Sequence, residues 1–343
     1  MSAFKNQLKK HLYTFETVPY LFVGPGLSRR YTTLPSQRAL LQNLCEAHLP
    51  HSFDYYEAKA TSLPEACSLV AEAFDEIGRA EERFGHPRDA STGNAEEREW
   101  ALKYELANLM DRSMSTNPEW SDEIALLSTI HIDGIITTNW DAFLESVLED
   151  FSVYIGQSEL LFSNVFHVGN IFKIHGCTSR PQSMVVTQRD HDTVSQKRDY
   201  LAAKLVTLFI EQPIIFMGYS LQDPTIQGIL KSLLNCLDDN NLNKLRGKFI
   251  FCEWVEGLET PSLQSGEMVI PGSKDHETLP IKHVRMDSFM PLYEVLASIR
   301  SRPSVKVLRN MQSMVLDYVK KAKPSDNVRL REFPGLNDLF SES

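Results

Sequence analysis

Residues 20–28 read YLFVGPGLS, a run of four hydrophobic residues followed at once by Gly24, Pro25 and Gly26. A short apolar run bounded by turn residues is typical of a buried strand. Glycine directly after a strand allows a tight turn and lets another group approach the backbone closely. The stretch therefore predicts a strand over residues 20–23 whose carboxyl end opens into a turn. Because such turns are rich in glycine anyway, this stretch alone leaves a structural and a ligand-binding interpretation open.

The rest of the chain alternates short apolar runs with helical patterns, which is typical of layered α/β proteins with a parallel sheet. Further strands are predicted at residues 134–137, 152–155, 170–174, 184–187, 213–217, 248–252 and 283–286. Helices are predicted between them, at residues 140–148, 190–212, 223–236 and 291–300. Residues 258–280 predict a long surface loop. We expect a Rossmann-like α/β fold, with a mostly parallel sheet and helices on both faces.

A helical insert is predicted after the first strand. Its helical patterns cover residues 37–48, 63–82, 96–114 and 122–129, and the polar stretch 84–94 predicts a mobile loop. The sequence thus predicts a nucleotide-binding type of α/β domain over residues 1–33 and 130–300, interrupted by a helical module over residues 34–129. Residues 301–343 predict a helix, over residues 305–321, and a polar tail.

The overall composition excludes several classes of protein. With 42% hydrophobic and 23% charged residues, the chain is typical of a globular protein, and it lacks the roughly 18 uninterrupted apolar residues of a membrane span. Its five cysteines are scattered without a CxxC pair, which argues against a zinc ribbon and favours a reducing cytoplasm. The net charge of −10 argues against phosphate-backbone binding, which depends on clustered Lys and Arg. We expect a cytoplasmic protein without a metal, a membrane contact or sequence-specific binding to nucleic acid.

Polar residues follow three further strands at their carboxyl ends, where ligands bind in open α/β sheets. Residues 135–141, IITTNWD, contain more polar groups than the single one needed to cap a following helix, so Asp141 stays unexplained by capping. Residues 171–177, IFKIHGC, place His175 and Gly176 at the end of an apolar strand. A histidine alone in such a place is more often a hydrogen-bonded core residue than a catalytic group.

The last of these segments is residues 216–224, FMGYSLQDP. Asp223 before Pro224 is well explained as the start of a helix, because an acidic residue caps the helix and proline suits its first turn. Gly218 and Ser220 precede that cap, so capping does not account for them.

Taken together and in this order, the four segments resemble the sirtuin (silent-information-regulator) superfamily. The forms Thr-Thr-Asn-x-Asp over residues 137–141, Lys-x-His-Gly over 173–176 and Gly-Tyr-Ser-x-x-Asp-Pro over 218–224 are similar to its divergent bacterial branch, the NAD-consuming effectors of anti-phage defence. The resemblance spans roughly residues 18–300, and its specificity lies in the set of motifs, since no single motif is specific.

The resemblance implies a role for each motif. NAD would be the substrate, held by glycine and serine residues after the first strand and a late strand: Gly24, Gly26, Ser28, Gly218 and Ser220. Asn139 would position the nicotinamide ribose and the attacking water. Asp141 would shape the nicotinamide pocket, and His175 would be the catalytic base.

The chain also departs from the deacylating members of that superfamily. It lacks their four-cysteine zinc module, and residues 29–35, RRYTTLP, stand where they carry an acidic-aromatic-arginine segment. Pro25 replaces their usual alanine. These differences put protein deacylation in doubt, because the zinc module helps to build the acyl-peptide cleft, and they leave the residues implied in NAD cleavage untouched.

Cleavage of the nicotinamide–ribose bond passes through an oxocarbenium-like transition state and releases a neutral pyridine, so it needs no strong general acid. Histidine suits the remaining task, which is to accept a proton from the oxygen nucleophile, because its ordinary pKa of ~6.5 lies near the working pH. Without an acyl-lysine cleft the nucleophile is water, and the products are nicotinamide and ADP-ribose. An NAD-dependent protein deacylase and a non-catalytic nucleotide-sensing module stay open as alternatives.

The same resemblance implies a partner. An unregulated NAD⁺ hydrolase would kill its host, so a toxic effector of abortive infection must be gated. We expect a separate sensor protein, such as a translocase-type ATPase or a short Argonaute, and a homo-oligomer.

Overall fold

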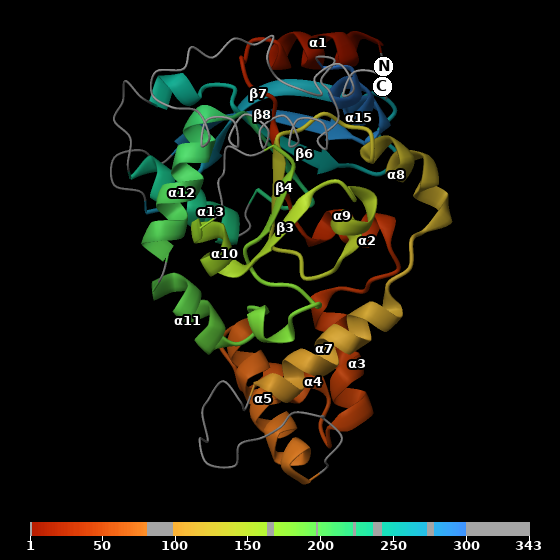
Figure 1. The fold of residues 1–343 in the computed structure, drawn as a ribbon, viewed down its shortest axis with the longest axis vertical. Helices are drawn as coiled ribbons and strands as arrows, with labels where there is room; N and C mark the ends of the chain where they lie inside the picture. Colours follow the sequence, from red (N-terminus) through yellow and green to blue (C-terminus); the bar gives the residue numbers. More distant parts are fainter. Residues whose placement is uncertain are drawn as a thin grey trace, which may run out of the picture.

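The computed structural model describes residues 2–80, 99–162, 168–196, 198–221, 224–235, 242–272 and 278–299. Eight strands form one sheet within these residues: β1 Tyr20–Val23, β2 Gly134–Thr137, β3 Ser152–Ile155, β4 Asn170–Lys173, β5 Ile214–Met217, β6 Phe249–Trp254, β7 Ser262–Val269 and β8 Thr278–Met286. Their order is β3-β4-β2-β1-β5-β6-β8-β7, and every neighbouring pair is parallel except β7 and β8. The expected α/β fold with a mostly parallel sheet is confirmed (Figure 1).

Each face of the sheet has its own hydrophobic core. In β1, Leu21 and Val23 belong to one core, whereas Tyr20 and Phe22 belong to the other, because successive side chains of a strand point to opposite faces. The first core includes residues of the helices α1 Ser2–Leu12, α2 Pro25–Tyr31, α8 Ser121–Leu127, α9 Phe143–Val147 and α15 Met290–Ser298. The second includes residues of α10 Gly156–Phe162, α12 Arg198–Glu211 and α13 Pro224–Leu234. Burial of the strands on both faces explains their continuous apolar runs.

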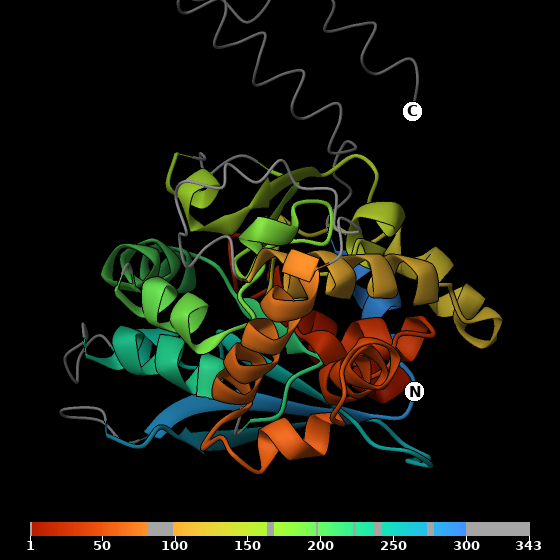
Figure 2. The same cartoon turned by 90° about the horizontal axis from the view of Figure 1, so that it is seen from below.

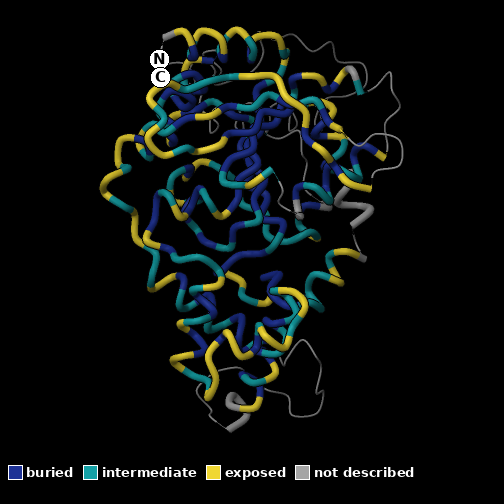
Figure 3. Tube along the Cα trace, turned by 180° about the vertical axis from the view of Figure 1, so that it is seen from behind, coloured by how far each residue is buried: buried dark blue, intermediate teal, exposed yellow. Residues whose placement is uncertain are grey.

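Four helices build a separate lobe at the tapered end of the molecule (Figure 1). They are α3 Gln37–His48, α4 Phe53–Glu57, α5 Leu63–Ala80 and α7 Trp100–Ser113. The lobe has a third core, which also takes in Met184 and Val186 from the chain after β4. Viewed from the lobe, its helices lie in front of the sheet (Figure 2). In Figure 3, buried residues run through the middle of both the sheet and the lobe. The lobe therefore packs directly against the segment that follows the strand of His175.

The last helix before β2 packs differently from the lobe. Leu127 of α8 belongs to the core under the sheet. Glu123 of α8 is buried and accepts hydrogen bonds from the Arg30 Nε at 3.0 Å and from the Tyr31 hydroxyl at 2.7 Å. Within the predicted insert of residues 34–129, α8 is thus attached to α2 and the sheet, whereas α3, α4, α5 and α7 form the lobe.

Two predictions of secondary structure are wrong. Residues 184–187 are not a strand, because the backbone N–H groups of Val186 and Thr187 donate to Asp190 Oδ2, and the apolar side chains pack into the lobe. The predicted loop over residues 258–280 contains β7 and the start of β8. β7 is an antiparallel edge strand with mostly exposed side chains, so its polar composition hides it from a search for apolar runs.

Helix boundaries also differ from those expected. The helix predicted over residues 190–212 is two helices, α11 Gln188–Gln196 and α12, and the helix predicted over 140–148 is shortened to α9. The helix α1 was not predicted, although Phe4, Leu8 and Leu12 place one apolar stripe on the core. The predicted loop 84–94, residue Asp223 and the segment 301–343 with its predicted helix lie outside the described residues. Among the helices that the structure describes, none has the length and hydropathy needed to cross a membrane.

Candidate active site

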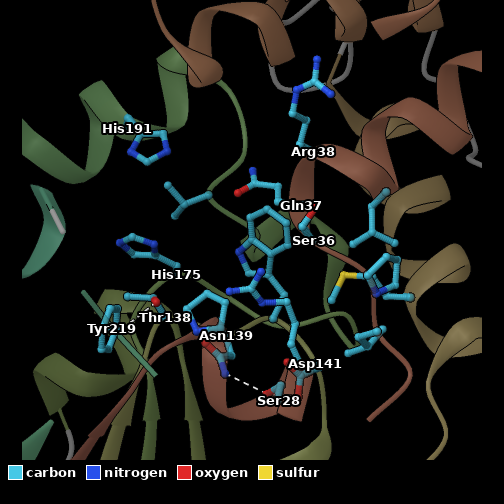
Figure 4. Close-up of a pocket in the computed structure, with 18 residues that line it drawn as sticks. Ser28, Ser36, Gln37, Arg38, Thr138, Asn139, Asp141, His175, His191 and Tyr219 are labelled. Carbon is cyan, nitrogen blue, oxygen red and sulfur yellow. Dashed lines mark hydrogen bonds between the residues drawn. The ribbon is translucent and has the colours of Figure 1, made fainter. Parts of the chain in front are cut away.

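Four strand ends meet at one edge of the sheet. β4, β2, β1 and β5 are neighbours and parallel, so their carboxyl ends lie side by side. A cavity of about 400 Å³ opens at this edge, between the strand ends and the lobe (Figure 4). Its polar and charged lining residues include Ser28, Arg29, Thr138, Asn139, Asp141, His175, His191 and Tyr219. Residues from all four predicted segments therefore surround one cavity.

Hydrogen bonds hold the Asn139 side chain in a fixed orientation and leave its oxygen atom available to a ligand. Its side-chain Nδ2 donates to the Gly24 carbonyl at 3.1 Å and to Ser28 Oγ at 2.9 Å (Figure 4). Its backbone N–H donates to Thr137 Oγ1 at 3.0 Å. The side-chain Oδ1 is buried and has no hydrogen-bond partner. Because both donors are used, Asn139 has an acceptor oxygen to offer to a hydroxyl group or a water in the cavity.

Asp141 completes this network and shapes the turn after β2. It accepts from Ser28 Oγ at 3.1 Å and from the Phe143 backbone N–H at 3.0 Å, both on Oδ1. The second of these bonds serves the first turn of α9, so Asp141 does take part in capping this helix. Asp141 therefore has a structural role in the turn while its side chain also lines the cavity.

Lys173 stabilises the same turn through its side-chain hydrogen bonds. Its side chain is fully buried, and Nζ donates to the Asp141 carbonyl and to the Glu145 carboxylate. Burial lowers the pKa of Lys173, but Glu145, Cys177 and Asp141 together more than offset this effect, so the pKa is raised. The lysine of the Lys-x-His-Gly segment thus fixes the position of the neighbouring strand end.

His175 lies directly after β4, and its ring lines the cavity. Its backbone carbonyl accepts from the Val185 N–H at 2.9 Å, which fixes the peptide in place. Among the described residues the ring has no hydrogen-bond partner. Burial, and then the neighbouring His191, lower the pKa of His175 to about 4. The imidazole is therefore neutral at neutral pH and able to accept a proton.

The glycines of the first and fourth segments pack against each other. A Cβ atom on Gly24 would lie 2.7 Å from the Gly218 carbonyl oxygen, and one on Gly218 would lie 2.5 Å from the Leu27 nitrogen. Gly218 also has a φ of +75°, which side chains other than glycine's rarely tolerate. Gly24, Gly26 and Gly218 do not line the cavity, and Ser220 is exposed outside it. A role for these four in binding the dinucleotide stays a prediction.

Comparison with known proteins finds a family that part of the chain resembles. Residues 133–265 match a family model described as a SIR2-like domain. The match includes Asn139, Asp141 and His175, whereas the turn with Ser28 precedes it. The sequence resemblance to the sirtuin superfamily is confirmed.

Two curated relatives are similar to part of the chain. The NAD(+) hydrolase ThsA of Cytobacillus dafuensis is 23% identical over a 208-residue alignment that covers 57% of this chain and 42% of that protein. The NAD(+) hydrolase ThsA of Bacillus cereus (strain MSX-D12) is 27% identical over 109 residues, which are 31% of this chain and 23% of that protein. The chain thus spans less than half the length of the curated relatives it matches.

The cavity is also lined by residues that the motifs did not single out. Arg29 is exposed and lines the cavity without a partner among the described residues. Its neighbour Arg30 is instead paired with Glu123 and stacked 3.6 Å over the Trp120 ring. Tyr219 joins two strand ends through a 2.7 Å hydrogen bond with Thr138. No local pattern separates Arg29 from Arg30, so only their packing distinguishes a cavity residue from a structural one.

The helix α11 and the lobe are joined next to the cavity. Lys103 of α7 is buried, and its Nζ lies 2.5 Å from Asp190 Oδ1 on α11. Asp190 in turn caps the start of α11 through the N–H groups of Val186 and Thr187. The lobe therefore holds the helix that carries His191. Among the residues that the structure describes, no group of His, Cys, Asp and Glu has an arrangement that could hold a metal ion.

Proposed function

We propose that this chain is an NAD⁺ hydrolase that cleaves the nicotinamide–ribose bond to give nicotinamide and ADP-ribose. One cavity holds both the buried Asn139 Oδ1 and the ring of His175, and neither has a hydrogen-bond partner among the described residues; this observation carries the proposal. Both curated relatives are named NAD(+) hydrolase, which supports it.

The proposed reaction follows from these two groups. Asn139 Oδ1 accepts a hydrogen bond from a ribose hydroxyl or from the attacking water and so orients it. The neutral His175 ring removes a proton from the water as its oxygen bonds to the glycosidic carbon. The electrons of the breaking carbon–nitrogen bond return to the pyridinium nitrogen, so nicotinamide leaves as a neutral molecule. Asp141 and Ser28 keep the Asn139 amide in the orientation that this requires.

Product analysis tests the proposed reaction. Incubated with NAD⁺, the purified chain is expected to form nicotinamide and ADP-ribose in equal amounts, measured by liquid chromatography. Adding an acetylated peptide is expected to change neither product, because the nucleophile is water. Formation of O-acetyl-ADP-ribose that depends on the peptide would favour a deacylase instead. Tight NAD⁺ binding without any products, in vitro and in phage-challenged cells, would favour a nucleotide sensor.

Arg29 supplies a second prediction for the same cavity. The guanidinium has no partner among the described residues, and its planar fork fits a phosphate group of the substrate. Arg29→Met is expected to raise the KM for NAD⁺ roughly 10- to 100-fold with little change in kcat, since a hydrogen bond to a charged group contributes about 1.5–3 kcal/mol. Steady-state kinetics measure both constants. Arg246→Met is the matched control, because Arg246 is exposed and does not line the cavity. An unchanged KM in Arg29→Met would exclude this role.

We further propose that the hydrolase is a toxic effector of abortive infection, gated by a separate sensor protein or by oligomerisation. Support comes from the motif resemblance and from the need to restrain an NAD⁺-destroying enzyme. Cells that carry the wild-type chain and its neighbouring genes are expected to lose NAD⁺ on phage challenge, whereas cells with Asn139→Ala are not. A purified chain that is a fully active monomer would argue against the gating.

A further inference from the structure

The reaction proposed above leaves a proton behind. Water supplies the oxygen that bonds to the glycosidic carbon, and one of its protons passes to His175. Nicotinamide departs neutral with the electron pair of the broken bond, so it does not carry this proton away. Each turnover therefore releases one proton, and His175 must lose it before the next NAD⁺ can react. This requirement rests on the proposed function.

His175 is poorly placed to release the proton straight into solvent. It lines the cavity that the substrate would fill, two residues after a strand buried at all four of its residues. His191 lies beside it on α11 and lines the same cavity (Figure 4). The two ring centroids are 5.9 Å apart, and the ring planes are at 82°. At this separation, one water molecule can bridge the nitrogens of the two rings.

The charges around the two rings favour movement of the proton outward. No carboxylate raises the pKa of His175, which burial and His191 lower to about 4. Burial also lowers the pKa of His191, but the carboxylates of Asp190 and Asp192 oppose this shift. Lys103 of α7 contacts Asp190 from the lobe, and Arg29 and Asp141 lie on the lining of the same cavity. A positive charge is thus better tolerated on His191 than on His175.

We propose that His191 is a relay residue that accepts the proton from His175 and passes it to solvent. It acts through His175 and does not itself activate the water. In sequence, a proton passes from water to His175, from His175 to His191, and from His191 to the buffer. Both histidines are half-buried, but the chain neighbours of His175 are buried, whereas Asp192 and Thr193 next to His191 are exposed. His191 therefore lies on the side of the pair that is nearer to solvent.

Buffer-dependent kinetics test the relay. In His191→Phe, which keeps a ring but cannot carry a proton, kcat in dilute buffer at pH 7 is expected to fall roughly tenfold, a part of the 10²- to 10⁴-fold effect of a complete general base. Added imidazole is expected to restore kcat, because a small base can collect the proton in place of His191. The wild-type rate is expected to be independent of buffer concentration. His131→Gln is the control, since His131 does not line the cavity and contacts the Ile299 carbonyl.

A measurement without turnover separates this inference from the proposed function. In His191→Gln the neighbouring imidazolium is removed, so the pKa of His175, followed by nuclear magnetic resonance of the labelled ring, is expected to rise. If the wild-type chain forms no nicotinamide, the proposed function is wrong, whereas an unshifted His175 titration would overturn the coupling of the two rings. Loss of kcat in His191→Phe that imidazole does not restore would assign His191 a purely structural role and overturn the relay.

Discussion

Replacing His175 by alanine is expected to lower kcat for NAD⁺ hydrolysis by about 10²- to 10⁴-fold, the usual contribution of a general base. The ring lines the cavity without a hydrogen-bond partner among the described residues, so its removal breaks no bond of the fold. Binding of ADP-ribose, measured by calorimetry, is expected to persist, because the remaining lining residues are unchanged. A variant with full kcat would exclude His175 as the base, and a variant that fails to bind ADP-ribose would point to a collapsed cavity.

The wild-type pH profile provides a second view of the same group. Only the neutral imidazole accepts a proton, and burial lowers the pKa of His175 to about 4. The value of kcat/KM is therefore expected to stay level as the pH falls through about 6.5, the ordinary pKa of histidine, and to decline only towards pH 4. The free energy of unfolding is expected to fall over the same range of pH. Below about pH 6.5 the unfolded chain binds a proton on this histidine, whereas the folded chain binds it only near pH 4, so the folded state loses stability between about pH 6.5 and 4. An inflection of kcat/KM at about 6.5 would show that His175 is not the buried base described here.

Gly176→Ala is expected to impair both stability and activity. Gly176 has a φ of +87°, and a Cβ atom there would lie 2.1 Å from the Ser183 carbonyl oxygen and 2.6 Å from the Met184 nitrogen. Both obstacles are backbone atoms, so the turn after His175 must move. We expect a loss of about 3 kcal/mol or more in the free energy of unfolding, measured with urea. We also expect a loss of at least about 100-fold in kcat/KM, because displacing a catalytic group by about 1 Å costs that much.

A matched glycine separates the collision from the backbone conformation. Gly257 has a similar φ of +72°, but nothing lies within 4 Å of the position of its Cβ atom. Gly257→Ala is therefore expected to cost only the 1–2 kcal/mol or so of the left-handed conformation and to leave NAD⁺ hydrolysis unchanged. Equal losses in the two variants would mean that the packing of Gly176 against Ser183 does not matter.

Local patterns were enough to locate most of the sheet and the centre of the site. Apolar runs mark β1, β2 and β5 because these strands are buried on both faces, so every residue must be apolar or hydrogen-bonded. Polar residues directly after such runs, among them Asn139 and His175, lie at strand ends for the same reason. An imidazole or amide that follows a parallel strand points to the edge where the other strand ends meet. The edge strand β7 was not predicted, because most of its side chains face solvent and it has no apolar run.

The remaining features depend on contacts between segments far apart in the chain. Arg29 and Arg30 are adjacent and chemically identical, yet only Arg30 meets Glu123, which lies 93 residues away. His191 acquires a role only because α11, held by Lys103 of the lobe, brings its ring to 5.9 Å from that of His175. The motifs predict that Gly24 and Gly218 contact a ligand. In the fold the two glycines pack against each other so closely that a Cβ atom on either one would collide with the backbone of the other. Strand identity follows from a few neighbouring residues, whereas partners for charges and rings follow from packing across the whole chain. For this reason the motifs predict where the proposed NAD⁺ cleavage takes place. The packing of the lobe against the sheet determines which further side chains lie close enough to take part in it.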